Sequence, residues 1–513
     1  MGAGPARDAE HYESVAAAAL AAYAALPPRG KPKRRDNRVP EWTVLAAVCL
    51  LRQSVQRAAE VRCVSLGTGL KALPHAKLPV HGDVLHDSHA EVIARRGFHL
   101  WTYAQIERAR KADAEKGKAP ETESEEEEAS YFERDSSGCW RLRPEWHVAF
   151  YVSTLPCGDA STYLLASAAS ELSADAAAPL MASHDNSGQA PSRSEAPQSS
   201  DKLVPSLQVA ARLGMSTSRD APRTDAFSTS FADPSSIVHR GRVSYESMSC
   251  LRTKPGRADS PPTTSHSCSD KLATWSLLGL QGALLSQLGV RRIPIEMLVV
   301  GGVPPEHRDR VEAEVRRAVG GRLEPWARSL GLSEADFRVP TVYLTDAVFE
   351  HSREAVAATE GCDPADIASC AESLSYVTDL SPWENTVEII VNGIRQGAPS
   401  RRKPGEPLGP KARSRLSKLS LFERFASLKS GSTPLTYHQA KHEASSEEPA
   451  ASSPKQPETS RPGPAYQSLK AALRQPEKGP FSGWLVSGRN WESFDANGNV
   501  NARSPDADTA DDV

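Results

Sequence analysis

The apolar residues of the chain recur in short blocks whose internal spacing predicts alternating helices and strands. Helical spacing marks residues 14–26, 41–55, 89–111 and 270–289. Short apolar runs bounded by Gly, Pro or Asp predict strands at 61–69, 145–154, 293–302, 338–346 and 385–393. Strands that alternate with helices indicate an α/β protein with a core sheet flanked by helices.

Polar stretches separate some of these blocks. Residues 111–137, 172–236 and 442–463 and the tail at 495–513 carry few large apolar side chains. Such segments cannot offset the entropy lost on ordering, so we expect them to be disordered. We predict one domain over residues 10–494 that is interrupted by the three insertions.

Composition narrows the cellular setting. Eight cysteines in 513 residues do not suggest a disulfide framework, which favours an intracellular protein of the nucleus, the cytoplasm or both. The basic run "KPKRR" at 31–35 is either a nuclear signal or part of the folded domain. No run is long and apolar enough to span a membrane, and no obligate protein partner is evident. A net charge of −3 neither indicates nor excludes a nucleic acid, although local basic runs can meet a polyanion.

Three potential metal ligands lie where helices are expected to begin. His89 opens the helix at 89–111, and Cys157 follows Pro156, a residue suited to the first turn of a helix. Cys268 follows Ser267, a candidate N-cap. The start of a helix favours thiolate over thiol, and one imidazole with two thiolates suits Zn²⁺ while leaving a fourth position for water.

Glu91 is spaced to move protons beside such a metal. Zinc deaminases combine an H-x-E element with a P-C-x-x-C element, in which the glutamate is not a ligand. Here the position three residues after Cys157 is Ala160, so the site either lacks a ligand or receives one from far along the chain, with Cys268 as the candidate. An H-x-E triplet alone is a weak signal, and a free cysteine is more often a small buried hydrophobe.

Longer motifs carry a family resemblance. "HAE" (89–91), "LPCGDAS" (155–161) and "SCSDKLATW" (267–275), in this order, resemble the editase domain of RNA adenosine deaminases. Further matches are "EWTVLAA" (41–47), "SLGTGLKAL" (65–73), "LRTKPGR" (251–257) and "YQSLKAAL" (466–473). The chain is most similar to the tRNA-specific branch, because no segment resembles an appended double-stranded-RNA-binding domain.

The resemblance implies a cytidine-deaminase-like core sheet and a zinc ion held by His89, Cys157 and Cys268, with Glu91 as the proton-transferring residue. The implied reaction is the hydrolytic deamination of adenosine to inosine in tRNA, at the adenosine 3′ of the anticodon in alanine tRNA. A base in an anticodon loop is unstacked at low cost. Lys71 matches a position that contacts RNA phosphate in the family.

The resemblance also implies a buried 1D-myo-inositol hexakisphosphate, enclosed by a C-terminal helical part. The positions that match its ligands are Arg95, Arg96, Lys271, Trp275, Lys418, Tyr437, Lys441, Tyr466, Lys470 and Trp484. Asp87 and Lys254, together with Lys271, are implied to link this cofactor to the zinc by hydrogen bonds. Two positions depart from the family pattern, Thr274 in place of an arginine and His86 in place of an asparagine.

Two other functions stay open. One is the editing of other RNAs or of nucleosides, although free-nucleoside deaminases of this fold are shorter and lack the lysine-rich C-terminal half. The other is a catalytically inactive RNA-binding relative that keeps zinc for structure. Retention of Glu91 favours catalysis, because a structural zinc site has no use for that carboxylate.

Overall fold

A computed structural model describes residues 5–52, 59–116, 130–166, 238–241, 247–254, 260–380, 386–399, 403–429, 436–442 and 466–500. Within them lies an eight-stranded sheet with the order β12-β11-β8-β2-β3-β14-β15-β16. Its strands are β2 (Leu45–Arg52), β3 (Glu60–Thr68), β8 (Trp146–Val152), β11 (Met297–Val300), β12 (Thr341–Leu344), β14 (Glu372–Val377), β15 (Val387–Val391) and β16 (Ile394–Arg395). β8, β11 and β12 are parallel and the other pairs are antiparallel. The predicted α/β class is confirmed, with a mixed sheet at its centre.

The central strand β2 overturns the prediction of a helix at 41–55. Its residues alternate between two cores: Ala46, Val48 and Leu50 pack on one face of the sheet, whereas Leu45 and Ala47 pack on the other. A strand buried on both faces reads as a continuous apolar run, which periodicity alone cannot distinguish from a buried helix. The period of two becomes visible only when the two cores are separated.

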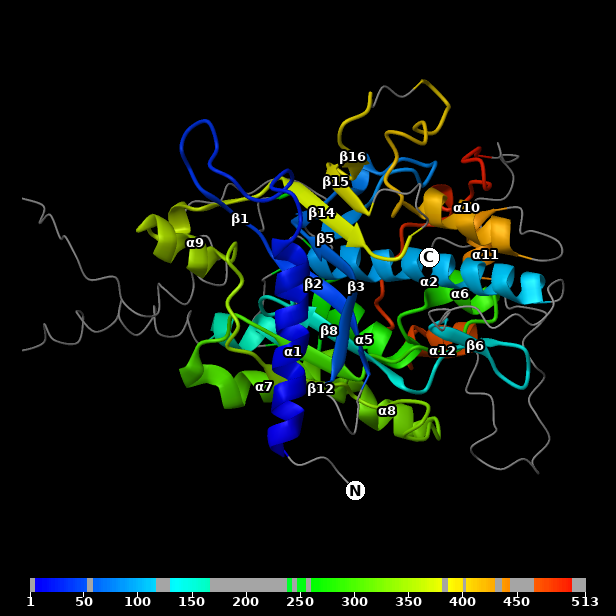
Figure 1. Cartoon of the computed structure of the whole chain (residues 1–513), viewed down its shortest axis with the longest axis horizontal. Coiled ribbons are helices and arrows are strands. Elements are labelled where there is room, and N and C mark those ends of the chain that lie inside the picture. Colours follow the sequence, from blue (N-terminus) through cyan, green and yellow to red (C-terminus); the bar gives the residue numbers. More distant parts are fainter. Residues whose placement is uncertain are drawn as a thin grey trace, which may run out of the picture.

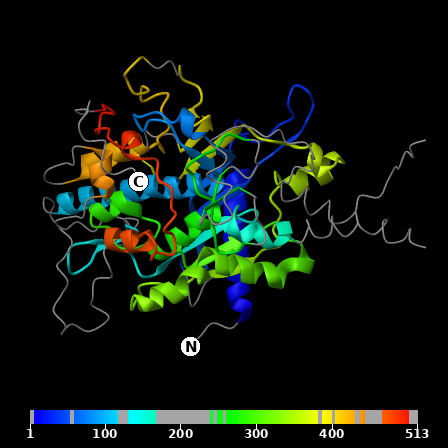
Figure 2. The same cartoon turned by 180° about the vertical axis from the view of Figure 1, so that it is seen from behind.

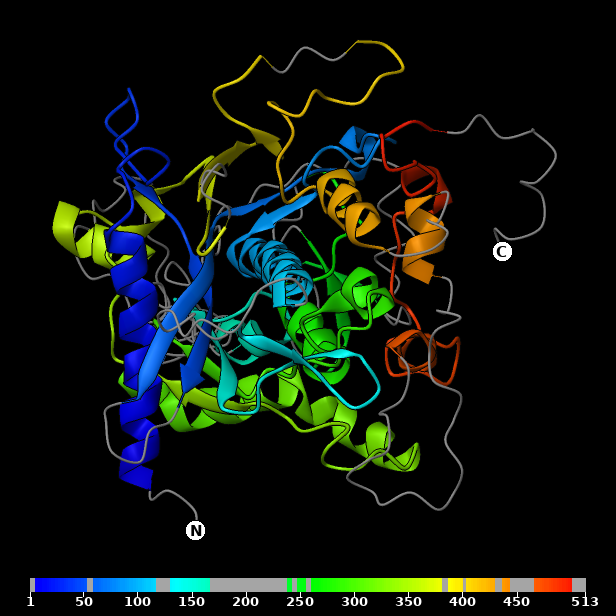
Figure 3. The same ribbon diagram turned by 45° about the vertical axis from the view of Figure 1, so that its right-hand side comes forward.

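Two long helices cover the two faces of the sheet (Figures 1 and 3). α1 (Pro5–Ala24) packs Val15, Ala19 and Tyr23 against one face. α2 (Ala90–Lys116) crosses the other face and belongs to the larger core. Both helices were predicted from their apolar spacing, and both are confirmed.

Gly67 lets α2 lie close to the sheet. A Cβ atom on Gly67 of β3 would stand 2.5 Å from side-chain carbons of Ile93 in α2, inside van der Waals contact. Gly97 of α2 faces Ser65 of β3 in the same way, at 3.0 Å. These contacts fix the height of α2 above β3, and with it the position of the first turn of α2.

The predicted helix at 270–289 is two helices. α5 (Cys268–Leu278) ends where Gly279 adopts a φ of 85°, and α6 (Gly282–Gln287) begins after a short turn. A positive φ is accessible to glycine at little cost, so Gly279 stops the helix that the apolar pattern alone would continue.

The C-terminal helices α10 (Lys418–Leu428), α11 (Tyr437–His442) and α12 (Tyr466–Leu473) gather beside α2 and α6 (Figure 2). Further α-helices are α7 (Arg308–Val319), α8 (Glu324–Ser329) and α9 (Arg353–Glu360). Two-stranded pairs join β1 (Glu41–Trp42) to β13 (Ala368–Ser369), β4 (Leu70–Ala72) to β5 (Asp87–His89), β6 (Phe132–Arg134) to β7 (Trp140–Leu142), and β9 (Val238–Arg240) to β10 (Leu251–Thr253). Short 3₁₀ helices cover His75–Lys77, Asp159–Ser161, Pro305–His307, Gly321–Leu323, Pro364–Asp366 and Arg489–Trp491.

The ranges predicted as insertions meet the described residues at their ends. α2 extends to Lys116 and β6 begins at Phe132, so ordered elements reach into both ends of the range 111–137. The insertion at 172–236 lies outside the described residues, as do 443–463 and 501–513. Among the helices that the structure describes, none is long and apolar enough to cross a membrane.

Candidate functional site

His89 stands where β5 ends and α2 begins. The Oδ1 atom of Asp87 accepts a hydrogen bond from the backbone N–H of His89 at 3.0 Å and lies 2.9 Å from Nδ1 of its ring. A carboxylate at Nδ1 orients the ring and leaves Nε2 as the nitrogen for a ligand. Glu91, in the first turn of α2, is buried beside it.

Cys157 lies in the loop after β8, and this corrects the prediction that Pro156 begins a helix. The 3₁₀ helix starts at Asp159, because Gly158 between them has a φ of 98°. A side chain at Gly158 would also collide with Ser267, whose Oγ would stand 2.2 Å from its Cβ. Because of this glycine, the helix begins only at Asp159, and the loop that contains Cys157 can pack against the start of α5.

Cys268 is the first residue of α5, where Ser267 is the N-cap as predicted and accepts a hydrogen bond from the N–H of Asp270 at 3.2 Å. The N–H of Cys268 donates to Sγ of Cys157 at 3.3 Å, and the N–H of Ser269 donates to the carbonyl of Cys157 at 3.0 Å. Two cysteines far apart in the sequence thus become neighbours through backbone hydrogen bonds.

The two thiols have different acidities. A hydrogen bond from Cys268 holds the pKa of Cys157 well below its usual value, despite burial, and the positive charge of Lys254 acts in the same direction. Burial raises the pKa of Cys268, although Nζ of Lys254 donates to its Sγ at 3.2 Å. The pair therefore favours one thiolate in the absence of a metal, and a cation would favour two.

The donor set fits zinc in its chemistry. The ring of His89 lies within hydrogen-bonding reach of Cys157, so the three predicted ligands are adjacent. In the part of the chain that the structure describes, however, no group of three or more His, Cys, Asp or Glu side chains is already arranged to hold a metal ion. One imidazole and two thiolates remain the set that Zn²⁺ takes in sites that keep a position open.

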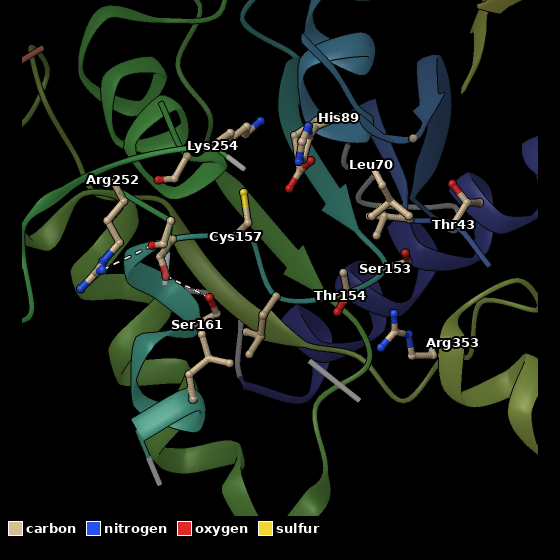
Figure 4. A pocket seen from close by; sticks show the side chains of 18 of the residues that line it. Thr43, Leu70, His89, Ser153, Thr154, Cys157, Ser161, Arg252, Lys254 and Arg353 are labelled. Carbon is tan, nitrogen blue, oxygen red and sulfur yellow. Dashed lines mark hydrogen bonds between the residues drawn. The ribbon is translucent and has the colours of Figure 1, made fainter. Parts of the chain in front are cut away.

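His89, Glu91 and Cys157 line one cavity of about 160 Å³ (Figure 4). Val44 and Leu70 add apolar walls, while Cys268 is fully buried and is not among the residues that line the cavity. Burial raises the pKa of Glu91, and the charge of Cys157 raises it further. A raised pKa makes a carboxylate a better proton acceptor, and the carboxyl group that forms can donate the proton again.

A second cavity of about 290 Å³ lies between α2, α5 and the C-terminal helices. All ten residues that the family resemblance pointed to line it: Arg95, Arg96, Lys271, Trp275, Lys418, Tyr437, Lys441, Tyr466, Lys470 and Trp484. Nε of Arg95 is buried without a hydrogen-bond partner among the described residues. The guanidinium of Arg95 instead lies 4.9 Å from the centre of the Trp275 ring.

Positive side chains outnumber carboxylates among the described residues that line the second cavity. Burial, with the charge of Lys441 adding to it, lowers the pKa of Lys470 to about 7, and burial lowers the pKa of Lys418 to about 8. The carboxylate of Glu492 already accepts hydrogen bonds from Lys418 at 3.1 Å and from Lys441. Buried cations in excess need an anion, so the cavity fits a polyanion.

Arg474 is a cavity residue that the sequence analysis missed. Its guanidinium lies 4.3 Å from the centre of the Trp484 ring, and it lines the second cavity. The available signal was its spacing, four residues after Lys470, which places both side chains on one side of α12 and its end.

Both departures from the family pattern lie at the second cavity. Burial lowers the pKa of His86 to about 3, and its Nε2 has no hydrogen-bond partner among the described residues. Thr274 donates to the carbonyl of Asp270 at 2.9 Å instead of presenting a cation. His86 thus keeps an unpaired ring nitrogen at the cavity, whereas the hydroxyl of Thr274 bonds to the helix backbone.

Asp87 connects the two cavities. Its Oδ1 orients His89, and its Oδ2 accepts hydrogen bonds from Lys254 at 2.7 Å, from Ser265 at 2.6 Å and from Lys271. His89 lines the first cavity and Lys271 the second. The structure therefore places the predicted relay residues in one continuous hydrogen-bonded group.

Lys71 lies on the surface near the first cavity. It pairs with Ser88 across β4 and β5, one residue from His89, and its Nζ donates to Oγ of Ser369 at 2.7 Å. Its side chain is exposed, as a phosphate contact requires.

Arg322, also missed from the sequence, ties the two cysteine segments together. Its guanidinium lies 2.7 Å from Oδ1 of Asp270 in α5 and 3.5 Å from Oδ2 of Asp159, which follows Cys157. All three side chains are buried. Since the partners are distant in the sequence, no local motif could reveal this contact.

Comparison with known proteins shows which family this chain matches. The family described as the adenosine-deaminase (editase) domain matches residues 65–486. The mouse protein named tRNA-specific adenosine deaminase 1 is 28% identical over 91% of this chain and 96% of its own length. The Saccharomyces cerevisiae protein of the same name is 24% identical over 84% of this chain and 86% of its own length. The Drosophila melanogaster double-stranded RNA-specific editase Adar is 26% identical over 52% of this chain and 30% of its own length.

The matched region contains His89, Glu91, Cys157 and Cys268 and covers most of the chain. The chain therefore belongs to the adenosine-deaminase (editase) domain family and is a deaminase, an enzyme that acts on C–N bonds.

Proposed function

We propose that this protein is a zinc-dependent tRNA adenosine deaminase that converts the adenosine 3′ of the anticodon in alanine tRNA to inosine. The observation that carries the proposal is Glu91, a buried carboxyl group that shares one cavity with His89 and Cys157. The tRNA substrate is supported by the relatives that cover most of this chain, whose names specify tRNA.

The residues that would hold zinc are His89 through Nε2 and the two cysteines Cys157 and Cys268 through Sγ. When bound there, zinc supplies the Lewis acidity that makes a water molecule nucleophilic at neutral pH. Asp87 keeps the His89 ring in the orientation and tautomer that such binding needs.

Glu91 moves the protons. The reaction consumes one water and one adenosine and yields inosine and ammonia, so a proton must pass from the water to the base and another to the leaving nitrogen. Glu91 is the carboxyl group in the cavity beside His89 and Cys157, and its raised pKa suits it to take a proton and give it back. Such acid–base help is worth roughly 10²–10⁴-fold in rate.

We propose that the second cavity holds 1D-myo-inositol hexakisphosphate. Seven cationic side chains line it: Arg95, Arg96, Lys271, Lys418, Lys441, Lys470 and Arg474. Their burial together is unfavourable without an anion, which makes the cofactor a requirement for stable folding as well as an occupant.

The substrate assignment is tested by incubating the purified protein with alanine tRNA, with a panel of other tRNAs and with duplex RNA, and then sequencing for inosine. We expect inosine at the adenosine 3′ of the anticodon in alanine tRNA. An alanine tRNA with guanosine at that position is the matched control and should gain no inosine.

The same panel separates the alternatives. Conversion of duplex RNA or other tRNAs without alanine tRNA would contradict the substrate assignment and favour editing of other RNAs. Binding of RNA without any conversion would favour the inactive RNA-binding relative.

A further inference from the structure

Cys49 and Cys63 stand directly opposite each other on the neighbouring strands β2 and β3, and both are free thiols. Residues that are paired in this way on antiparallel strands have their Cα atoms roughly 4.5–5.5 Å apart. A disulfide bond joins residues whose Cα atoms are roughly 4.4–6.8 Å apart. The spacing of the two strands therefore already suits a bond between these two sulfurs.

A β-bulge creates this pairing. Val48 of β2 pairs with Ser65 of β3. The next residue, Cys49, pairs with Cys63, so Val64 is the extra residue of β3. Without the bulge, Cys49 would face Val64. An irregularity inside the central sheet therefore brings the two thiols together.

Both thiols lie on the face of the sheet that α1 covers (Figure 1). Cys49 belongs to the core beneath α1 and is fully buried, whereas Cys63 packs against that core and is partly exposed. A hydrogen bond between the two side chains, together with burial, raises the pKa of Cys49 well above its usual value. Cys63 is therefore the sulfur that a small oxidant in the solvent reaches first.

We infer that Cys49 and Cys63 form an oxidative modification site, at which a peroxide joins the two side chains in a disulfide bond that thiols can reduce again. In the first step the thiolate of Cys63 attacks one oxygen of hydrogen peroxide and the O–O bond breaks. Cys63 becomes a sulfenic acid, and the hydroxide that leaves takes up the proton that the Cys63 thiol has lost.

The second step forms the disulfide. The sulfur of Cys49 attacks the sulfur of Cys63, the S–O bond breaks, and the departing hydroxide takes the thiol proton of Cys49 and leaves as water. The two thiols together lose two hydrogens and two electrons, and one hydrogen peroxide becomes two waters.

The bond would act on the sheet and not on the catalytic cavity. Neither cysteine is among the residues that line the cavity of His89 and Glu91. The bond closes a loop of about 15 residues between β2 and β3, which restricts the unfolded chain. We therefore expect oxidation at this site to stabilise the folded protein.

The test treats the full-length protein with a small excess of hydrogen peroxide, alkylates the remaining thiols and maps the unreduced peptides by mass spectrometry. We expect a linked peptide pair that contains Cys49 and Cys63, lighter by two hydrogens and lost on treatment with dithiothreitol. The map distinguishes this bond from one between Cys157 and Cys268, the other two neighbouring cysteines. Alkylation of both Cys49 and Cys63, or oxidation of Cys63 to a sulfinic acid without a link, would overturn the inference.

Cys63→Ser should abolish the link and leave Cys49 as a thiol that is alkylated once the protein is unfolded. Cys139→Ser is the matched control, because Cys139 is also partly buried but is not paired with either residue. It should keep the link. A link from Cys49 to another cysteine in Cys63→Ser, or loss of the link in Cys139→Ser, would overturn the pairing.

The melting temperature gives a second readout. Peroxide treatment should raise the melting temperature of the wild-type protein relative to Cys63→Ser that is treated in the same way, and dithiothreitol should remove the difference. An equal or lower melting temperature of the treated wild-type protein would show that the native sheet does not accommodate the bond and would overturn the inference.

Discussion

Lys254 and Asp87 form a buried ion pair in which Nζ lies 2.7 Å from Oδ2, with side chains 2% and 5% exposed. The same lysine donates to Sγ of Cys268, and the same carboxylate orients His89. One pair of charges therefore fixes two of the three predicted zinc ligands.

Lys254→Met should destabilise the protein and reduce its zinc content. Removing one partner of a buried pair leaves the other uncompensated, which typically costs about 3–5 kcal/mol. Lys271 still contacts Asp87, so we expect the lower end of this range. Urea unfolding gives the stability, and mass spectrometry of the metal gives zinc per chain. Wild-type stability and zinc content in this variant would contradict the role of the pair.

Arg322→Met should also lower stability, because it leaves the buried carboxylate of Asp270 without its arginine, whereas Asp159 keeps its ion pair with Arg317 at 2.7 Å. Arg328→Met provides the control: its exposed pair with Glu324, at 4.0 Å, should contribute less than about 1 kcal/mol. The two variants are compared by urea unfolding under one set of conditions. Equal effects would show that Arg322 does not join the two cysteine segments.

The second cavity should make stability depend on pH when no polyanion is present. The pKa of Lys470 is about 7 in the folded protein and that of a free lysine is near 10.4, so above about pH 7 the folded state binds fewer protons than the unfolded state. Stability without the polyphosphate should therefore rise with pH from about 7 toward 10. Refolding yields from urea at pH 6.5 and pH 9, with and without added inositol hexakisphosphate, measure this.

Without the polyphosphate the yield should be higher at pH 9, and with it the yield at pH 6.5 should recover. Lys470→Met, which removes the titrating group, should weaken the dependence on pH. Equal yields at both pH values without polyphosphate would count against an uncompensated cationic cavity.

From the sequence, the residues of the candidate site could be predicted more reliably than the helices and strands that carry them. His89, Glu91, Cys157 and Cys268 lie in motifs, and a motif keeps its residue types wherever the chain places them. The helix expected at 41–55 is instead strand β2, because burial on both faces of the sheet hides the period of two. Tertiary packing decided this case, and no local pattern records it.

Among the residues that line the second cavity or join the cysteine segments, some could be predicted from motifs and others could not. Arg95 and Lys470 could be assigned because each lies in a stretch with a family match. Arg474 and Arg322 could not, since their significance comes from Trp484 and Asp270, partners brought close only by the fold. The close approach of Gly158 to Ser267, which leaves no room for a side chain at position 158, likewise could not be predicted from the sequence.

The proposed function requires that Glu91 transfers protons at a zinc ion held by His89, Cys157 and Cys268. The most direct measurement compares wild-type protein with Glu91→Gln, recording both zinc per chain and the rate of inosine formation in alanine tRNA. We expect Glu91→Gln to keep about one zinc per chain, because Glu91 is not a ligand, and to lose roughly 10²-fold or more of the rate. Deamination at the wild-type rate, or loss of zinc together with activity, would contradict it.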